Sequence, residues 1–235
     1  MPNHALLNNA QHRDLRIITR SGADLGDNVM CALTFPAEFR NIQSHYPILF
    51  LESRDKVLAP VALFGLREGQ NLFLTKDGWD ARYIPLMIER QPFLIGQSDK
   101  GQVIHVDLDS PRVSKTEGVR VFNDDGANTD YLNRVSNALA AINDGFAGTP
   151  KFVNALIEHR LLEAFTLDIQ YHDGNKAKFG GFHTIHEERL RKLDGAALGK
   201  LHEQGYLEPL FMIVASLSKI RDLVDRASKL DPAAR

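Results

Sequence analysis

Short apolar runs separated by polar turns fill the first half of the chain, and this spacing limits what the chain can fold into. Residues 47–51 and 57–64 are two such runs, and the polar segment 53–56 lies between them. Runs this close together form antiparallel hairpins, because parallel strands need a long crossover connection. Residues 15–19, 93–95 and 103–108 continue the pattern. We therefore expect a mostly antiparallel sheet in the N-terminal half.

Helical periodicity replaces this pattern in the second half. Between residues 131 and 142, apolar side chains recur on one helical face. Thr149 can cap a second helix and Pro150 suits its first position, so residues 143–148 are predicted to be a loop between two helices. A shorter helix is predicted earlier, at residues 79–90, although it contains a proline.

The last third is predicted to contain one hairpin and then helices. Residues 165–171 and 178–182 can pair around a turn at 173–175. Thr184 and Glu187 have the spacing of a capping box that opens a helix. Pro209 is predicted to open the final helix.

These patterns together predict an α+β fold, in which the sheet of the N-terminal half packs with a helical C-terminal half. The sequence shows no long linker, so we expect a single domain over residues 1–235. Two lobes remain an alternative, a β-rich one at 1–125 and a helix-rich one at 126–235.

Composition and charge exclude several classes of function. The net charge of −2 provides no basic field for nucleic acid, so no nucleic-acid partner is expected. No apolar stretch is long enough to span a bilayer and no signal peptide is evident, so we expect a cytoplasmic protein without a membrane span. Cys31 is the sole cysteine, which excludes an internal disulfide, and its apolar neighbours predict a buried, inert thiol.

A metal site has one local candidate. His105 and Asp107 lie two residues apart on a predicted strand and would share a face, as ligands do in iron(II) oxygenases with two histidines and one carboxylate. A distant histidine, His172 or His183, would have to complete the site. The alternative is that His105 and Asp107 lie on the solvent-facing side of a strand. That interpretation is favoured, so neither a metal nor another cofactor is predicted.

No other catalytic motif is present. The chain has no glycine-rich dinucleotide or phosphate loop and no Gly-x-Ser-x-Gly elbow. This absence favours a protein that is not an enzyme, and an enzyme stays open as the alternative.

A set of ordered motifs resembles the SapC family of bacterial proteins over nearly the whole chain. The motifs are Asn8-x-x-x-His12-Arg13-Asp14-Leu15-Arg16, Glu38-Phe39, Tyr46-Pro47-Ile48-Leu49-Phe50, Ala62-Leu63-Phe64-Gly65-Leu66, Asn71-Leu72-Phe73, Tyr83-Ile84-Pro85, Arg90-Gln91-Pro92-Phe93, Gly181-Phe182-His183-Thr184-Ile185 and Ser216-Leu217-Ser218-Lys219-Ile220. The resemblance implies an association with a surface-layer locus, and with neighbouring genes for TonB-dependent receptors, cupin-type oxygenases and flavin halogenases. It implies no reaction and no catalytic residue.

Six polar residues recur inside these motifs and could line a common pocket. They are His12, Arg16, Glu38, Asn71, Tyr83 and Arg90. Convergent polar groups mark a binding site. The alternative is structural, with the same residues making turn contacts and a satisfied buried network.

Three hypotheses of function follow. The first is a non-catalytic accessory protein that binds a protein partner or small ligand in a pathway linked to the envelope or to TonB-dependent receptors. The second is an iron(II)-dependent oxygenase that uses His105 and Asp107. The third is a structural protein associated with the surface layer.

Overall fold

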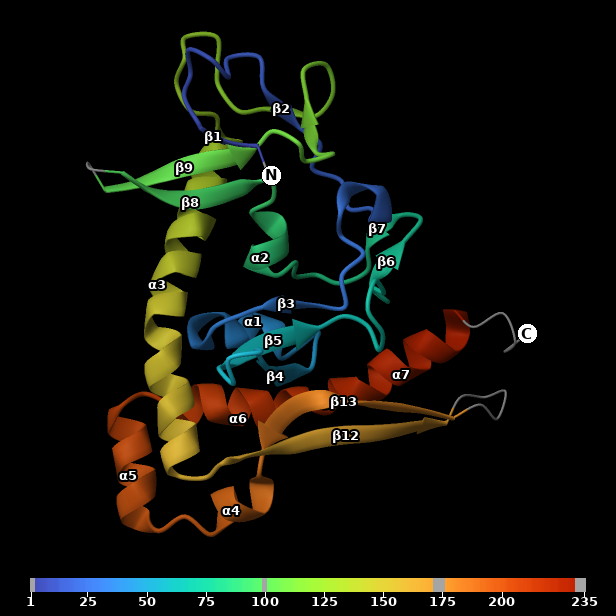
Figure 1. Cartoon of the computed structure of the whole chain (residues 1–235), viewed down its shortest axis with the longest axis vertical. Helices are drawn as coiled ribbons and strands as arrows, with labels where there is room; N and C mark the ends of the chain where they lie inside the picture. The colour runs from blue at the N-terminus through green and yellow to red at the C-terminus, as the bar shows by residue number, and fades with distance from the viewer. Residues whose placement is uncertain (1–2, 99–100, 171–175, 231–235) are drawn as a thin grey trace. The chain divides into compact units, whose positions relative to one another are not determined.

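The computed structural model describes residues 3–98, 101–170 and 176–230 (Figure 1). Strands lie mostly in the N-terminal half and pair antiparallel, and the helices lie mostly in the C-terminal half. This arrangement confirms the predicted α+β class. The predicted turn at 173–175 and His172 lie outside the described residues.

The chain divides into two compact units whose segments alternate along the sequence. Unit 1 consists of Met1–Asn28, Leu74–Asp80 and Leu86–Asp144, and unit 2 consists of Val29–Phe73, Ala81–Pro85 and Gly145–Arg235. These bounds differ from the lobes 1–125 and 126–235, because the chain enters unit 2 twice before residue 126. The single domain over 1–235 stays a prediction.

The described strands of unit 1 form three small antiparallel groups. The first has the order β1 (His4–Leu6), β9 (Gly101–Asp107), β8 (Phe93–Ser98); the second has β10 (Val113–Ser114), β2 (Arg16–Ile17), β11 (Val119–Arg120); the third is β6 (Leu74–Thr75) with β7 (Gly78–Trp79). A 3-10 turn at Ala23–Leu25 precedes the passage into unit 2. The strands predicted around 15–19, 93–95 and 103–108 are confirmed as β2, β8 and β9.

The core of unit 1 gathers side chains from these strands and from α3 (Asp130–Glu158). Ile17, Phe93 and Val106 are fully buried in it. Leu132 and Val135 pack against them from the start of α3, on the apolar face that the helical periodicity predicted.

The helix predicted at 79–90 is much shorter. Trp79 pairs in β7, and α2 covers Leu86–Glu89. Pro85 directly precedes α2. A proline ring clashes with the preceding turn of a helix, so Pro85 disfavours a helix that runs through it, and α2 begins directly after it.

Unit 2 is built on a five-stranded antiparallel sheet. Its order is β12 (Leu162–Gln170), β13 (Lys176–Ile185), β4 (Ile48–Glu52), β5 (Leu58–Leu63), β3 (Cys31–Leu33). The strands predicted at 47–51 and 57–64 are confirmed as β4 and β5, and the predicted hairpin is confirmed as β12 and β13. β12 and β3 are the edges of the sheet.

Helices complete unit 2. They are the second half of α3, the 3-10 turn Pro36–Glu38, α1 (Phe39–Ile42), α4 (Glu187–Arg191), α5 (Gly195–Glu203), α6 (Leu207–Ser216) and α7 (Lys219–Leu230). α6 packs against β4, β13 and α1. Phe39 and Tyr206 both contact the ring of Phe152 edge-on. Over the parts of the chain that are described, no helix combines the length and apolarity needed to cross a membrane.

The capping box predicted at Thr184 does not form. Thr184 pairs with Glu163 inside β13, whose pairing with β12 continues to Ile185. Thr184 is therefore extended, and α4 begins without a side-chain cap at His186. Two helices follow, α4 and then α5, and Asp194 starts α5 by accepting a hydrogen bond from Ala197 N at 2.8 Å.

The loop predicted at 143–148 is helical, so α3 is one helix where two were predicted. The ring of Phe35 lies against Gly145, where a β-carbon would come within 2.1 Å of Phe35 Cδ2. Thr149 does not cap a new helix, because its hydroxyl donates to Gly145 O at 2.8 Å within α3. Gly145 leaves room for the ring of Phe35, which comes from another segment. Thr149 and Pro150 therefore did not mark the start of a second helix.

Candidate functional site

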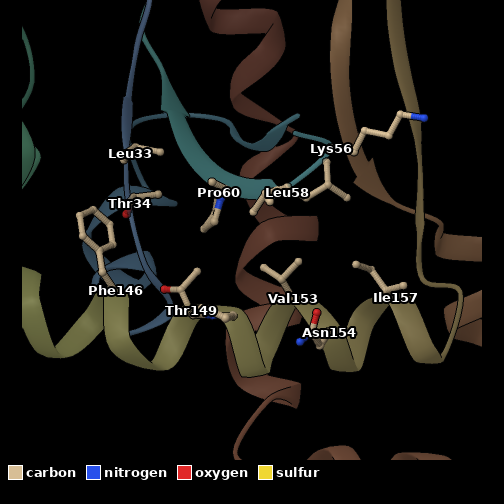
Figure 2. A pocket seen from close by; sticks show the side chains of 13 residues that line it. Leu33, Thr34, Lys56, Leu58, Pro60, Phe146, Thr149, Val153, Asn154 and Ile157 are labelled. Carbon is tan, nitrogen blue, oxygen red and sulfur yellow. The ribbon is translucent and has the colours of Figure 1, made fainter. Parts of the chain in front are cut away.

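A groove in unit 2 lies between the β3 side of the sheet and the second half of α3 (Figure 2). Its volume is about 350 Å³. It is lined by Leu33, Thr34, Lys56, Val57, Leu58, Ala59, Pro60, Phe146, Thr149, Pro150, Val153, Asn154 and Ile157. The walls therefore come from three separate stretches of sequence, namely β3, β5 with its preceding turn, and α3.

Apolar side chains in this groove remain open to water. Leu33 is 39% exposed, Val57 62% and Ile157 50%. Figure 2 shows Val153 and Ile157 rising from α3 towards the side of the groove formed by Leu58 and Pro60. Grouped apolar side chains in a hollow mark a binding site, because leaving them in water is unfavourable.

Two threonine hydroxyls line the groove, and both donate their protons elsewhere. Thr34 Oγ1 donates to Glu38 Oε2 at 2.6 Å, and Thr149 Oγ1 donates to Gly145 O. Both threonines are buried. Their hydrogen bonds are made within the protein, so the groove is less polar than its composition suggests.

Lys56 stands at one end of the groove, on the tight turn between β4 and β5. Ser53 N donates to Val57 O at 2.9 Å, and Lys56 N donates to Ser53 O at 3.0 Å. The turn holds Lys56 at a φ of 59°, in the left-handed region that a residue with a β-carbon rarely adopts. In Figure 2 the ammonium nitrogen points away from α3.

A buried carboxyl group lies behind Thr34. Glu38 is 3% exposed, and its second oxygen, Oε1, accepts a hydrogen bond from the Tyr83 hydroxyl at 2.9 Å. Tyr46 in turn donates its hydroxyl to the backbone oxygen of Tyr83 at 2.5 Å. Both carboxyl oxygens therefore have hydroxyl donors, which a buried carboxyl group requires. The arrangement is a polar network that begins at the groove wall.

Three of the six residues predicted to share a pocket lie in unit 2. The structure brings Glu38 and Tyr83 into direct contact. Asn71 is also buried, and its Oδ1 accepts from Phe73 N at 3.0 Å. Glu38 and Tyr83 were both predicted to belong to one site, and they are partners in one network. Neither of them lines the groove; Thr34, which donates to Glu38, does.

The other three predicted residues lie in unit 1 and bond to nearby backbone. His12 Nδ1 is 3.2 Å from both the nitrogen and the oxygen of Asn8. Arg16 donates to Gly118 O at 3.0 Å. Arg90 donates to Phe93 O at 2.6 Å, and burial lowers its guanidinium pKa. These contacts match the structural alternative of turns and strand ends.

The candidate metal ligands do not form a cluster in the described residues. His105 and Asp107 lie on β9 in unit 1, and His183 lies on β13 in unit 2. The His105 ring lies on Gly96, where a β-carbon would come within 2.5 Å of it. Across residues 3–98, 101–170 and 176–230, no three His, Cys, Asp or Glu side chains are placed to hold a metal ion.

Three residues at or just after the end of β13 each have a buried polar atom without a partner. Nδ1 of His183, Oγ1 of Thr184 and Nδ1 of His186 have no hydrogen-bond partner within the described chain. Glu163 Oε2 is 3.7 Å from His186 Nδ1, beyond hydrogen-bond distance. Unpartnered buried polar atoms are uncommon in native proteins, and an ordered water is the ordinary partner.

Cys31 was predicted to be buried, but it is only half-buried on β3. Burial raises the pKa of its thiol, so the thiol is protonated at neutral pH. A protonated thiol is a poor nucleophile, which agrees with the inert role predicted for it.

A second hollow of about 300 Å³ lies between the start of α1 and α6. Arg40 and Glu208 line it and form an ion pair with each other. Their charges are largely compensated, and both side chains are mostly exposed. The hollow therefore has less to offer a ligand than the apolar groove.

Comparison with known proteins assigns the family. The SapC family model matches residues 7–223. The chain belongs to the SapC family. This confirms the resemblance carried by the ordered motifs. No curated protein and no solved structure matches the chain.

Several SapC motif residues have structural roles in unit 2. Ser216 of the C-terminal motif is fully buried and accepts a hydrogen bond from Ile48 N at 2.9 Å, so it fastens α6 to the start of β4. Tyr46, Glu38 and Tyr83 belong to three different motifs and meet in one network. These motifs therefore maintain the frame of unit 2 beside the groove.

Sequence reasoning missed the groove itself. Its lining residues fall in a strand edge, a turn and a helix, and no local pattern connects these segments. Val57 lies in the run predicted to be a strand at 57–64, and Ile157 lies in the helix predicted to begin at Pro150, yet both are largely exposed. The identity of an apolar residue does not say whether it is buried, so no sequence signal marked the groove.

Proposed function

We propose that this SapC-family chain is a binding protein that holds an apolar small molecule in the groove between β3, β5 and α3. The observation that carries the proposal is the exposure of Leu33, Val57 and Ile157 around one hollow. Burying these side chains against a ligand would contribute about 25 cal/mol per Å² of apolar surface removed from water.

The size of the groove favours a small ligand. Pockets for small molecules measure about 300–1,000 Å³, and about 350 Å³ lies at the lower end of that range. A protein partner would ordinarily bury about 800 Å² on each side, which is more than a hollow of this size provides.

Binding of a neutral fluorescent probe tests the proposal. N-phenyl-1-naphthylamine emits more strongly in apolar surroundings, so titrating it against the protein measures occupancy of apolar sites. Ile157→Glu places a carboxylate in the groove and should weaken binding by at least about tenfold, because an ion in an apolar contact loses hydration.

Phe211→Glu is the matched control. Phe211 is 53% exposed, close to the 50% of Ile157, and it also lies on a helix but outside the groove lining. The probe should bind the Phe211 variant as tightly as the unaltered protein. Equal loss in both variants, or no probe binding to the unaltered protein, would refute the groove as a ligand site.

This proposal is one form of the accessory role predicted from the sequence. A link to the envelope or to TonB-dependent receptors, and a cytoplasmic location, remain predictions. The oxygenase hypothesis receives no support from the described residues, because His105 and Asp107 gain no third ligand there.

A further inference from the structure

We infer that the ligand of the groove is an amphipathic anion, a short alkyl chain with one carboxylate, and that Lys56 receives the carboxylate. This inference rests on the proposed function, since it names the class of molecule that the same groove would bind. The apolar chain would lie between Leu58, Pro60 and Val153, and the charged head would lie at the Lys56 end.

The charge of the lining indicates an anion. Among the thirteen lining residues, all of which are described, Lys56 alone carries a charge at neutral pH. Within the described chain, its ammonium has neither a carboxylate nor a hydrogen-bond partner, whereas the cations of Arg40 and Arg191 are paired with glutamates. A cation at the end of an apolar hollow complements a molecule with an apolar body and an anionic end.

The two threonine hydroxyls of the lining do not compete for a carboxylate in the interior of the groove. The hydroxyl protons of Thr34 and Thr149 are donated to Glu38 and to Gly145 O. A carboxylate can only accept hydrogen bonds, so neither threonine can hold it. Among the side chains of the lining, the exposed donors that remain are the Asn154 amide on α3 and the ammonium of Lys56.

The backbone of Lys56 gives a second reason to assign it a role. A left-handed residue in a hairpin turn is ordinarily Gly or Asn, because a β-carbon is disfavoured there. Lys56 occupies this position at a φ of 59°. Lysine is therefore unfavourable for the turn, and its four-carbon side chain can carry the ammonium from outside the groove to its mouth.

The test compares octanoate, 1-octanol and octyltrimethylammonium as competitors of N-phenyl-1-naphthylamine. In the Lys56→Met variant, octanoate should bind about fivefold more weakly, the change expected for one exposed ion pair. 1-Octanol should bind the unaltered protein and the variant equally. Octyltrimethylammonium should bind the variant at least as tightly as it binds the unaltered protein. Lys56→Arg should restore octanoate binding, and 1 M salt should reduce the difference between the proteins.

Chain length provides an independent readout. From hexanoate to octanoate, each added methylene should strengthen binding about fourfold while the groove has room. Lys56→Gly removes the ammonium and relieves the turn, so it should lose octanoate affinity while its thermal stability does not fall. This separates a lost ligand contact from a damaged fold.

The outcomes separate the two proposals. If the probe and octanol bind and octanoate is unaffected by Lys56→Met, the anion inference is refuted and the apolar groove stands. If octanol and octanoate weaken equally in Lys56→Met, the charge assignment is also refuted. If neither octanol nor the probe binds the unaltered protein, both proposals fail.

Discussion

Two glycines of α3, three residues apart, should respond differently to the same substitution. A β-carbon at Gly148 would have no atom within 4 Å, whereas one at Gly145 would lie 2.1 Å from Phe35 Cδ2 and 2.4 Å from Phe35 Cγ. Phe35 is 2% exposed and packs edge-on against Phe146, so displacing its ring would disturb a buried contact. Gly148→Ala therefore tests helix propensity alone, whereas Gly145→Ala also tests the packing of Phe35 against the helix.

The magnitudes follow from helix propensity and from packing. Alanine is better than glycine in a helix interior by about 1 kcal/mol, so Gly148→Ala should raise the free energy of unfolding by about that amount. Gly145→Ala has the same gain, but inserting a methyl group into a packed contact costs about 1–3 kcal/mol. Gly145→Ala should therefore be neutral to about 2 kcal/mol destabilising.

Urea unfolding monitored with two probes measures the difference. The sole tryptophan, Trp79, lies in unit 1 and reports on that unit by fluorescence, while circular dichroism reports on the helices. Coincident transitions would permit a single free energy of unfolding for each variant. Phe35→Leu combined with Gly145→Ala should recover part of the loss, because the two substitutions act on one contact.

Equal stabilisation by both alanines would refute the contact between Phe35 and Gly145. Failure of Gly148→Ala to stabilise would refute a continuous helix at this point, since the propensity gain exists only in a helical segment.

Three further predictions concern side-chain hydroxyl groups. Tyr83→Phe should lower the free energy of unfolding by about 1.5–3 kcal/mol, because the buried Glu38 loses a hydroxyl donor. Chemical denaturation measures this change, and an unchanged denaturation midpoint would contradict the network. Ser216→Ala should cost about 1–3 kcal/mol by removing the acceptor of Ile48 N, while Ser218→Ala on the exposed side should change stability by less than about 0.5 kcal/mol in the same assay. Burial raises the pKa of Tyr131 to about 12 against the opposing charge of Arg112, so below pH 10 this group should leave stability unchanged. As pH rises from 10 towards 12 the unfolded chain ionises first, and the resulting loss of stability should be smaller in Tyr131→Phe; identical pH profiles would count against it.

Local patterns predicted the strands well where each run was bounded by turns. β4, β5, β8 and β9 all appear where apolar runs were found, because a buried strand requires little beyond its own residues and an antiparallel neighbour. The hairpin of β12 and β13 was predicted for the same reason.

Helix boundaries were predicted less well, because distant contacts decided them. Gly145, Gly148 and Pro150 have the composition of a loop, yet Phe35 packs against Gly145 and the helix continues. Thr184 has the spacing of a cap, yet its pairing with Glu163 keeps it in a strand. In both cases a residue far along the chain outweighs the local preference.

The candidate site was predictable only in part. The resemblance to the SapC family directed attention to Glu38 and Tyr83, which meet as a polar network. The groove beside them depends on how three segments approach each other. Nothing in the sequence around Lys56 indicated its left-handed backbone conformation, which is visible only in the structure.

The alternation of the two units along the chain has a practical consequence. The segments Val29–Phe73 and Leu86–Asp144 belong to different units, and α3 begins in one unit and ends in the other. No single cut, therefore, yields a fragment that contains one complete unit and nothing of the other. Searches for a binding partner or ligand should use the whole chain as bait, because a truncated piece would expose half of a core and capture proteins non-specifically through that surface.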